Sequence, residues 1–243
     1  HMSTYEHDKN KLYSGFLSFL HNLPFYGLAI VCLDDPGVKE VMPKISRSVI
    51  TYGTTDKADI YAKDIQFSES KTSFDVYRKS KNKKISVELN LPGVHNIQNA
   101  LAAIAVATEL DINDRFIIKA FKNFSGINRR FQVTKNIAVK DGKITLIDDY
   151  GHHPTEILAT INAIKSGWGS KRITLLFQPH RYTRTKELFS EFVEVLSEVD
   201  QLIITEIYAA GEKPIDNISG QSIMEGIKNK SSKKPFYVSS LQE

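Results

Sequence analysis

The chain has 243 residues, of which 41% are hydrophobic and 25% charged, and a net charge of +4, so it can form one large or two ordinary globular domains. No apolar run approaches the roughly 20 residues of a membrane-spanning helix, and no basic start precedes an apolar segment; the sequence therefore predicts neither membrane insertion nor a secretory signal peptide. The single cysteine, Cys32, excludes an internal disulfide and fits a reducing cytosol. It lies in the apolar run LAIVCL and is predicted to be buried.

The first half of the chain predicts helices mixed with strands. Apolar residues at helical spacing, among them Leu12, Phe16 and Phe19, predict the first helix, and LAIVCLDD is typical of a buried parallel strand. An Ala- and Leu-rich run predicts a later helix, and Asp114 is predicted to cap the one after it. The predicted elements are a helix over 8–22, a strand over 28–35, a short helix over 38–42, strands over 48–52 and 59–66, a hairpin over 72–90, and helices over 96–110 and 114–123.

The clearest basic run extends from Arg78 to Lys84, between two stretches of alternating polarity, TSFDVY and ISVELN. This arrangement is typical of the solvated tip of a β-hairpin. The alternative is a nucleic-acid contact, but no aromatic residues interleave with the charges and no known motif surrounds them. The sequence therefore predicts no nucleic-acid partner.

The second half predicts an α/β domain. Strands over 131–138 and 143–149 flank an Asp141-Gly142 turn, a good hairpin signal. From residue 143 onward strands alternate with helices, which predicts a doubly wound, mostly parallel sheet. A change in amino-acid composition near Gly126 predicts two domains, residues 1–125 and residues 126–243. The later predicted elements are helices over 154–166, 185–198 and 219–229, and strands over 172–177, 201–206 and 235–239.

Three polar loops, 148–154, 178–184 and 206–214, follow predicted strands, and ligands of open α/β sheets bind at the carboxyl ends of strands. The first two loops are therefore expected to be neighbours. Two arginines three residues apart, Arg181 and Arg184, suit the capture of a carboxylate or a phosphate. Histidines in both loops can bind anionic oxygens or move protons. The candidate residues are Asp149, Tyr150, His152, His153, Gln178, His180, Arg181 and Arg184.

A zinc site is an alternative reading of these loops, because Asp149, His152, His153 and His180 are suitable ligand types. Adjacent histidines usually point apart, however, and the sequence has neither an H-E-x-x-H nor a C-x-x-C pattern.

Two further motifs suggest nucleotide contacts. In LPGVHNIQNALAA, Asn96 and Asn99 share a helix face, and their amides can both donate to and accept from an adenine edge; helix capping is the alternative. In SGINRRF, Arg129 and Arg130 lie at the predicted domain junction, where they are either linker charges or contacts to a phosphate.

Taken together, the motifs HMSTY, FLHNLPFYG, LPGVHNIQNALAA, GINRRF, DDYGHHPTEI, FQPHRYTRT and YAAGEKPI follow one another in an order that resembles the Mur ligases of peptidoglycan synthesis. The resemblance runs along essentially the whole chain. The pair DDYGHHPTE and QPHRYTRT is similar to the branch of the family that adds L-alanine; the branches that add later amino acids have different residues there.

This resemblance implies an ATP-dependent ligase of cell wall biogenesis, and with it roles in cell shape and cell division. ATP would phosphorylate the lactoyl carboxylate of UDP-N-acetylmuramate, and the amine of L-alanine would attack the acyl phosphate. The cofactors would be ATP and Mg²⁺ and the location the bacterial cytoplasm. The implied fold is the back half of a central ATPase domain followed by a Rossmann-like C-terminal domain; the oligomeric state stays open.

The family motifs also imply roles for individual residues. His1 matches a magnesium ligand, although His-Met is also a common cloning remnant. Asn96 and Asn99 match adenine contacts, and Arg130 and Asp149 match nucleotide-side catalytic residues. The remaining matches, Tyr150, His152, His180, Arg181 and Arg184, would line the face where the muramate carboxylate meets alanine, and His152, Arg181 and Arg184 would also be catalytic.

The sequence also departs from the family pattern. The G-T-H-G-K-T-T phosphate loop, the magnesium-binding glutamate and the sugar-nucleotide domain are missing, and the closing strand is expected beyond Glu243. The fragment alone is therefore expected to be inactive and to bind ATP weakly or not at all. The alternatives are a recycling ligase that joins a peptide to the same sugar nucleotide, a non-catalytic ligand-binding module and, more remotely, a zinc hydrolase.

Overall fold

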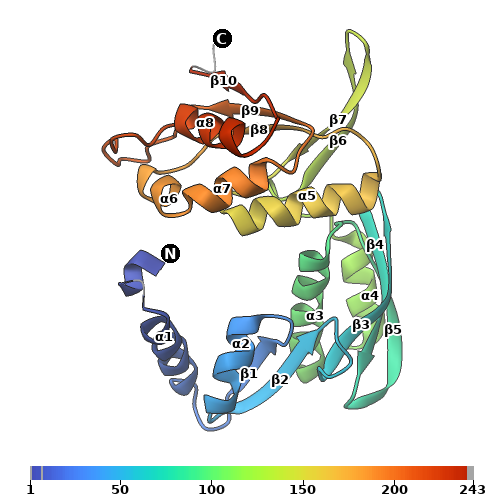
Figure 1. Ribbon diagram of the computed structural model, residues 1–243. Helices are drawn as coiled ribbons and strands as arrows, with labels where there is room; N and C mark the ends of the chain where they lie inside the picture. The colour runs from blue at the N-terminus through green and yellow to red at the C-terminus, as the bar shows by residue number, and fades with distance from the viewer. Residues whose placement is uncertain (1, 7, 240–243) are drawn as a thin grey trace. The chain divides into compact units, whose positions relative to one another are not determined.

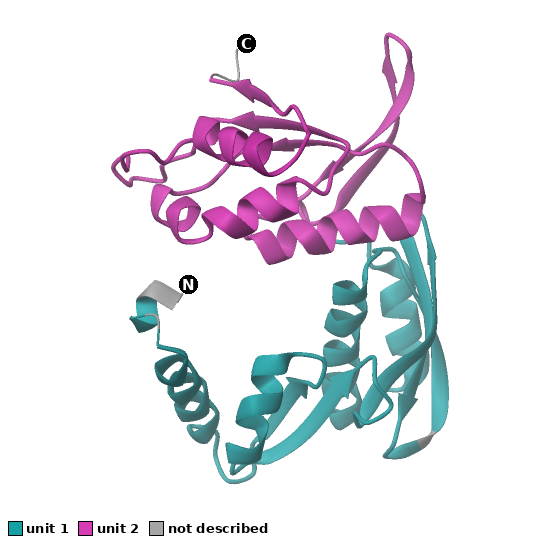
Figure 2. Ribbon diagram, in the orientation of Figure 1, with its two compact units in different colours: residues 1–126 teal, residues 127–243 magenta. Residues whose placement is uncertain are grey.

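A computed structural model describes residues 2–6 and 8–239 (Figure 1). The chain forms two compact units, residues 1–126 (unit 1) and residues 127–243 (unit 2), each with its own hydrophobic core (Figure 2). The division between the units falls after Gly126. The assignment of the first unit to ATP binding and of the second to a Rossmann-like ligase domain stays a prediction. Among the described helices, none is long and apolar enough to cross a membrane.

Unit 1 contains a five-stranded sheet in the order β1-β2-β3-β4-β5. The first three strands are parallel, and β4 and β5 add to them as an antiparallel hairpin. The strands are β1 (Leu28–Cys32), β2 (Ser48–Gly53), β3 (Ile60–Ser68), β4 (Lys71–Arg78) and β5 (Lys81–Leu89). The predicted hairpin is therefore confirmed, with its tip inside the basic run.

The helices of unit 1 follow the predicted order. Helix α3 supplies the centre of the core, because Ile97, Leu101 and Ile104 are fully buried together with Val76 and Val87 of the hairpin. No residue of α1 is buried. The helices are the 3-10 helix η1 (Met2–Tyr5), α1 (Lys9–His21), α2 (Pro36–Val41), the 3-10 helix η2 (Met42–Lys44), α3 (Val94–Glu109) and α4 (Asp114–Asn123).

Three predictions for unit 1 need correction. The N-cap residue of α4 is Asn113, whose side chain accepts a hydrogen bond from the Arg115 N–H. Asp114 instead forms a bidentate ion pair with Arg78, with N–O distances of 2.7 and 2.8 Å. Arg78 is accordingly buried and does not belong to the solvated tip. Cys32 is only partly buried, because β1 is an edge strand that pairs with β2 alone.

Unit 2 contains a parallel sheet in the order β10-β9-β8 and a separate antiparallel ribbon of β6 and β7. Helix α7 packs against α5 and α8, and its Phe192 and Leu196 are fully buried with Ile204 of β9. The strands are β6 (Gln132–Val139), β7 (Gly142–Asp148), β8 (Thr174–Phe177), β9 (Gln201–Thr205) and β10 (Phe236–Val238). The helices are α5 (Pro154–Trp168), α6 (Tyr182–Glu187), α7 (Phe189–Leu196) and α8 (Gly220–Lys230).

Two details of unit 2 differ from the sequence-based picture. β7 pairs with β6 across a tight turn at Lys140 and Asp141, with Gly142 already in β7, and it does not join the parallel sheet, because a local hairpin satisfies its hydrogen bonds. The predicted helix over 185–198 is two helices: Leu188, at φ −113° and ψ 26°, leaves the helical region and turns the chain between α6 and α7. The α/β class and the parallel sheet are confirmed.

Candidate functional site

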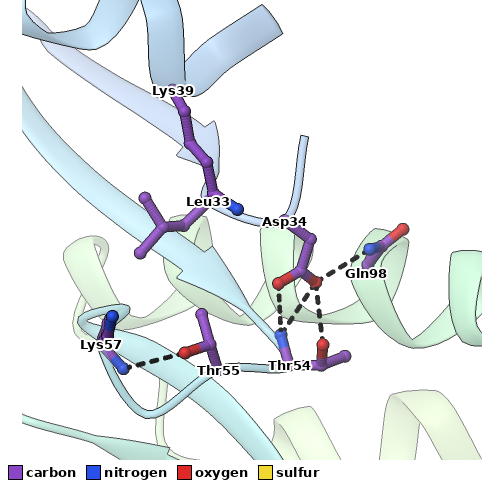
Figure 3. A pocket seen from close by; sticks show the side chains of 7 residues that line it. All are labelled: Leu33, Asp34, Lys39, Thr54, Thr55, Lys57 and Gln98. Carbon is purple, nitrogen blue, oxygen red and sulfur yellow. Dashed lines mark hydrogen bonds between the residues drawn. The ribbon is translucent and has the colours of Figure 1, made fainter. Parts of the chain in front are cut away.

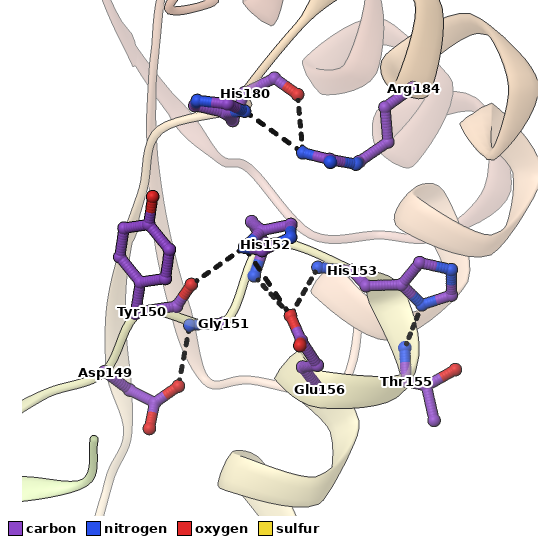
Figure 4. Close-up of polar contacts among 9 residues, drawn as sticks. All are labelled: Asp149, Tyr150, Gly151, His152, His153, Thr155, Glu156, His180 and Arg184. Atoms are coloured by element: carbon purple, nitrogen blue, oxygen red, sulfur yellow. Dashed lines mark hydrogen bonds and ion pairs between the residues drawn. The ribbon is translucent and has the colours of Figure 1, made fainter. Parts of the chain in front are cut away.

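Two loops that are far apart in the sequence meet in unit 2. The histidine loop, residues 149–153, follows β7, and the arginine loop, residues 178–184, follows β8 and includes the start of α6. The ring centroids of His152 and His180 lie 6.0 Å apart (Figure 4). The expected neighbours are therefore together, although β7 and β8 belong to different sheets.

The start of α5 explains part of the polar character of the histidine loop. His153 is the N-cap residue; its Nδ1 accepts from the Thr155 backbone N–H at 3.3 Å, and Pro154 follows at the first helical position. The Glu156 carboxylate accepts from the backbone N–H groups of His152 at 2.9 Å and of His153 at 3.1 Å, completing a capping box. Burial opposes the ionisation of Glu156, but these hydrogen bonds outweigh it and lower its pKa.

Asp149 fixes the geometry of the loop through both carboxylate oxygens. Its Oδ2 accepts from the Phe131 N–H at 2.9 Å and its Oδ1 from the Gly151 N–H at 2.7 Å. A Cβ at position 151 would lie 2.8 Å from Oδ1, so only glycine lets the carboxylate approach this closely. Asp149, predicted to be catalytic, thus has a clear structural duty within unit 2.

Tyr150 links the histidine loop to the arginines that precede β6. The Arg129 and Arg130 guanidinium carbons lie 4.5 and 5.7 Å from the centroid of its ring, and the Tyr150 N–H donates to the Arg129 carbonyl at 2.7 Å. The ring also makes an edge contact with His152 at 5.5 Å. Of the two arginines, Arg129 therefore lies nearer to the Tyr150 ring than Arg130 does. The sequence had suggested only a linker or a phosphate-binding role for it.

The arginine loop combines an exposed and a buried cation. Arg181 is exposed and has φ +73°, a left-handed conformation that is costly for a residue with a side chain. Arg184 is only 7% exposed; its Nη1 lies 3.1 Å from His180 Nδ1 and donates to the His180 carbonyl at 3.2 Å (Figure 4). Its Nε has no hydrogen-bond partner within the described part of the chain.

The electrostatics of this cluster favour a bound anion. Burial, and after it the neighbouring cations Arg184 and Arg181, lower the pKa of His180. Burial and Arg181 likewise lower the pKa of Arg184, which still remains a cation. An anionic oxygen bound here would relieve the repulsion and satisfy the buried donor. The arrangement is thus suited to a carboxylate or a phosphate.

Two residues of the third loop were not identified as candidates. The Tyr208 ring stacks on His180, with centroids 5.5 Å apart and planes inclined by 24°. The Glu212 carboxylate accepts from the N–H and hydroxyl of Thr183, at 3.0 and 2.7 Å. Both lie in the motif YAAGEKPI, and the position of this loop after a strand was the available signal.

The two predicted adenine contacts lie on α3 in unit 1. Asn96 is half-buried and donates its Nδ2–H to the Pro92 carbonyl at 2.7 Å, which leaves its Oδ1 as an acceptor. Asn99, one turn further along, is exposed. One amide is therefore partly committed to the helix start, and the other is accessible.

Unit 1 also contains a polar pocket of about 420 Å³ that the sequence did not predict (Figure 3). Asp34 accepts at one oxygen from the Thr54 N–H at 2.9 Å and the Gln98 Nε2–H at 2.9 Å. A Cβ at Gly53 would lie 2.6 Å from the other oxygen. The lining residues are Leu33, Asp34, Lys39, Thr54, Thr55, Lys57 and Gln98.

The metal predictions find no support in the described residues. His1, the predicted magnesium ligand, lies outside them. Within residues 2–6 and 8–239, no three His, Cys, Asp or Glu side chains gather in a way that could hold a metal ion. The carboxylate of Asp149, one of the proposed zinc ligands, is occupied by two backbone N–H groups.

Comparison with protein families accounts for both units. Residues 1–107 match the model of the Mur ligase middle domain, and residues 129–243 match that of the Mur ligase glutamate ligase domain. The chain belongs to the Mur ligase family. Members of this family are ATP-dependent ligases that form amide bonds.

Solved structures of Mur ligases share the fold. UDP-N-acetylmuramate-alanine ligase MurC from Thermotoga maritima is 25% identical, with 99% of this chain and 49% of that chain covered and a TM-score of 0.74. MurF from Acinetobacter baumannii is 19% identical, with 94% and 46% covered and a TM-score of 0.69. MurF from Thermotoga maritima, in complex with ADP, is 19% identical, with 88% and 44% covered and a TM-score of 0.61. The chain thus spans about half the length of these Mur ligases.

Proposed function

We propose that this chain is part of an ATP-dependent Mur ligase that joins L-alanine to the lactoyl carboxylate of UDP-N-acetylmuramate. The observation that carries the proposal is the contact between the histidine loop and the arginine loop. There Arg184 is buried beside His180, and no carboxylate of the described residues is among its hydrogen-bond partners. The likeness to the MurC structure, which covers almost the whole chain, supports the same substrate class.

In this proposal the reaction has two steps. A lactoyl carboxylate oxygen attacks the γ-phosphorus of ATP, which gives an acyl phosphate and releases ADP. The amine of L-alanine then attacks the acyl carbon, loses a proton, and expels inorganic phosphate as the amide forms. Each intermediate carries anionic oxygens, so a cationic cluster at the reacting carbon lowers the barrier.

The residues of unit 2 then have distinct roles. Arg181 and Arg184 bind the carboxylate or acyl phosphate, and His180 adds a neutral imidazole against the same oxygens. His152 lies across from His180, where it can accept a proton from the alanine amine. Tyr150 lines the substrate side. Asp149 holds the histidine loop in place.

Each unit, taken by itself, has side chains suited to a nucleotide. Asn99 and the free oxygen of Asn96 suit the edge of adenine, and Arg130 suits a phosphate. That a Mur ligase has been solved in complex with ADP supports ATP as the cosubstrate. Magnesium would bridge the phosphates of ATP and neutralise their charge; among the described residues, no group of three His, Cys, Asp or Glu side chains could hold a metal ion. The enzymes of this family are cytoplasmic, and we propose the same location for this one.

The proposal is tested by measuring ADP release from the complete gene product with ATP, magnesium and UDP-N-acetylmuramate, with and without L-alanine. Release should require L-alanine and should fall about 100-fold in Arg181→Ala, as expected when a donor to a developing anion is removed. Arg172→Ala, an exposed arginine just before β8, is the matched control and should leave the rate unchanged. Release that is independent of alanine, or that a peptide restores, would move the assignment to a recycling ligase. No release would favour a binding module.

A further inference from the structure

The loop after β9 contacts the arginine loop at several points. We define the clamp loop as residues 206–212. Its Tyr208 N–H donates to the Pro179 carbonyl at 2.8 Å, and its Tyr208 carbonyl accepts from the Arg181 N–H at 2.9 Å. These two bonds form a short parallel bridge between His180 and Tyr208. The backbone of the arginine loop is therefore paired with the clamp loop at the residue where its conformation is least favourable.

Two side chains of the clamp loop strengthen this pairing. The Tyr208 ring covers one face of the His180 imidazole, at 5.5 Å and 24°. The Glu212 carboxylate accepts both the N–H and the hydroxyl of Thr183, which lies between the two arginines. A carboxylate that accepts two donors from one residue fixes the direction of that segment more tightly than a single contact can.

The clamp loop is itself anchored to the sheet and to α8. The Glu206 carboxylate accepts from the Ile207 N–H at 2.7 Å, the Gly220 N–H at 3.1 Å and the Tyr237 hydroxyl at 2.6 Å. A Cβ at Gly220 would lie 2.2 Å from the Thr205 carbonyl oxygen, so glycine permits the close packing of α8 against the end of β9. The clamp loop is thus held by hydrogen bonds to α8 and β10.

Local geometry shows why an anchor is needed. Arg181 has φ +73°, and Ala210 of the clamp loop has φ +49°; residues with side chains keep such conformations only when surrounding contacts hold them. The buried cation Arg184 and the exposed cation Arg181 also repel each other. Without the clamp, the arginine loop would relax and separate the donors that face an anion.

We propose that Tyr208 and Glu212 are positioning residues: they hold His180, Arg181 and Arg184 in the arrangement that receives the anionic oxygens of the substrate. This inference rests on the proposed function for its effect on turnover, but its structural part stands independently. Neither side chain is assigned a contact with the reacting atoms. They act through the arginine loop.

The structural part is tested on this chain by nuclear magnetic resonance. Tyr208→Ala should remove the ring-current shift of the His180 imidazole protons, whereas Tyr208→Phe, which keeps the ring, should preserve it. Glu212→Ala should accelerate hydrogen exchange of the Thr183 amide at least tenfold, while amides of α8 stay protected. Glu225→Ala, an exposed glutamate on α8, is the control. An unchanged His180 resonance in Tyr208→Ala, or an unchanged Thr183 amide in Glu212→Ala, would overturn the proposal.

The functional part is tested in the complete gene product by separating KM from kcat. Glu212→Ala and Tyr208→Ala should raise the KM for UDP-N-acetylmuramate about tenfold and leave the KM for ATP unchanged. Tyr208→Phe, which keeps the ring, should have the KM for UDP-N-acetylmuramate of the unmodified enzyme. If the KM values for UDP-N-acetylmuramate and for ATP rise equally, the variants are generally unfolded, and this result would contradict a positioning role. If the unmodified enzyme shows no ligase turnover, the proposed function fails, and the resonance experiment alone decides whether the clamp positions the arginine loop.

Discussion

At the scale of single residues, the candidate site uses side chains that also build the fold. His153 caps α5, Asp149 closes the turn before it, and Glu156 completes the capping box. Clusters of titratable residues after predicted strands identified this region from sequence, because such clusters have no packing explanation. The sequence could not separate the imidazole that caps a helix from the one that faces the arginines, since that depends on backbone conformation.

The two half-buried histidines predict a pH dependence of stability. Burial is the largest cause that lowers the pKa of both His153 and His180 below the ordinary value of about 6.5. The unfolded chain therefore takes up protons at a higher pH than the folded chain, so the stability of unit 2 should decrease as the pH falls below about 6.5.

Urea unfolding of unit 2 at pH 7.5 and pH 5.5 measures this dependence. His153→Asn, which can still cap α5, should reduce the difference between the two pH values. The carboxylates with lowered pKa, Glu156 and Glu212, titrate below this window and do not interfere. Equal stability at both pH values in the unmodified chain would contradict the account.

Asp149 should contribute substantially to the stability of unit 2. Asp149→Ala leaves the Phe131 and Gly151 N–H groups without their acceptor, so the free energy of unfolding should fall by about 2 kcal/mol. The exposed neighbour Asp148 provides the control, and Asp148→Ala should cost less than about 0.5 kcal/mol. Similar losses for both variants, measured by chemical unfolding, would show that the two hydrogen bonds are not the cause.

At the scale of elements, hydrophobic period and turn residues were sufficient to locate most helices and strands. The hairpin over 72–90 and the Ala-rich helix α3 appear where predicted. Pairing was harder to predict: alternation shows that β7 is a strand but cannot specify its partner. The break at Leu188 lies where the polar residues of α6 give way to the apolar residues of α7, and no Gly or Pro marks it, so the sequence gave no sign of it.

The ion pair between β4 and α4 should be important for unit 1. Arg78 has no exposed side-chain surface, and its partner Asp114 has a pKa lowered chiefly by the hydrogen bonds from Arg78. Arg78→Met leaves a partly buried carboxylate unpaired and should destabilise unit 1 by about 3 kcal/mol.

The double variant Arg78→Met/Asp114→Leu should recover most of this loss, because two apolar side chains can replace a buried pair. The exposed pair of Lys81 and Asp111 is the control, and Asp111→Ala should cost less than about 1 kcal/mol. If the double variant is as unstable as Arg78→Met, the loss comes from packing and not from the unpaired charge.

At the scale of the whole chain, two separate cores predict two units that unfold separately. Unit 1 is centred on α3 and its sheet, and unit 2 on α7 and the parallel sheet. Arg78→Met should therefore accelerate hydrogen exchange in residues 1–126 only, and Asp149→Ala in residues 127–243 only. Mass spectrometry of exchanged peptides measures both effects, and a variant that loosens both units equally would show one cooperative structure.

The central claim, an acyl-phosphate ligase, is tested most directly with oxygen isotopes. UDP-N-acetylmuramate labelled with ¹⁸O in its lactoyl carboxylate is incubated with ATP, magnesium, L-alanine and the complete gene product, and the released phosphate is analysed by mass spectrometry. The account predicts one ¹⁸O atom in each phosphate released, since a carboxylate oxygen leaves with the phosphoryl group when the amine displaces it. Phosphate without label, formed together with ADP, would contradict the claim.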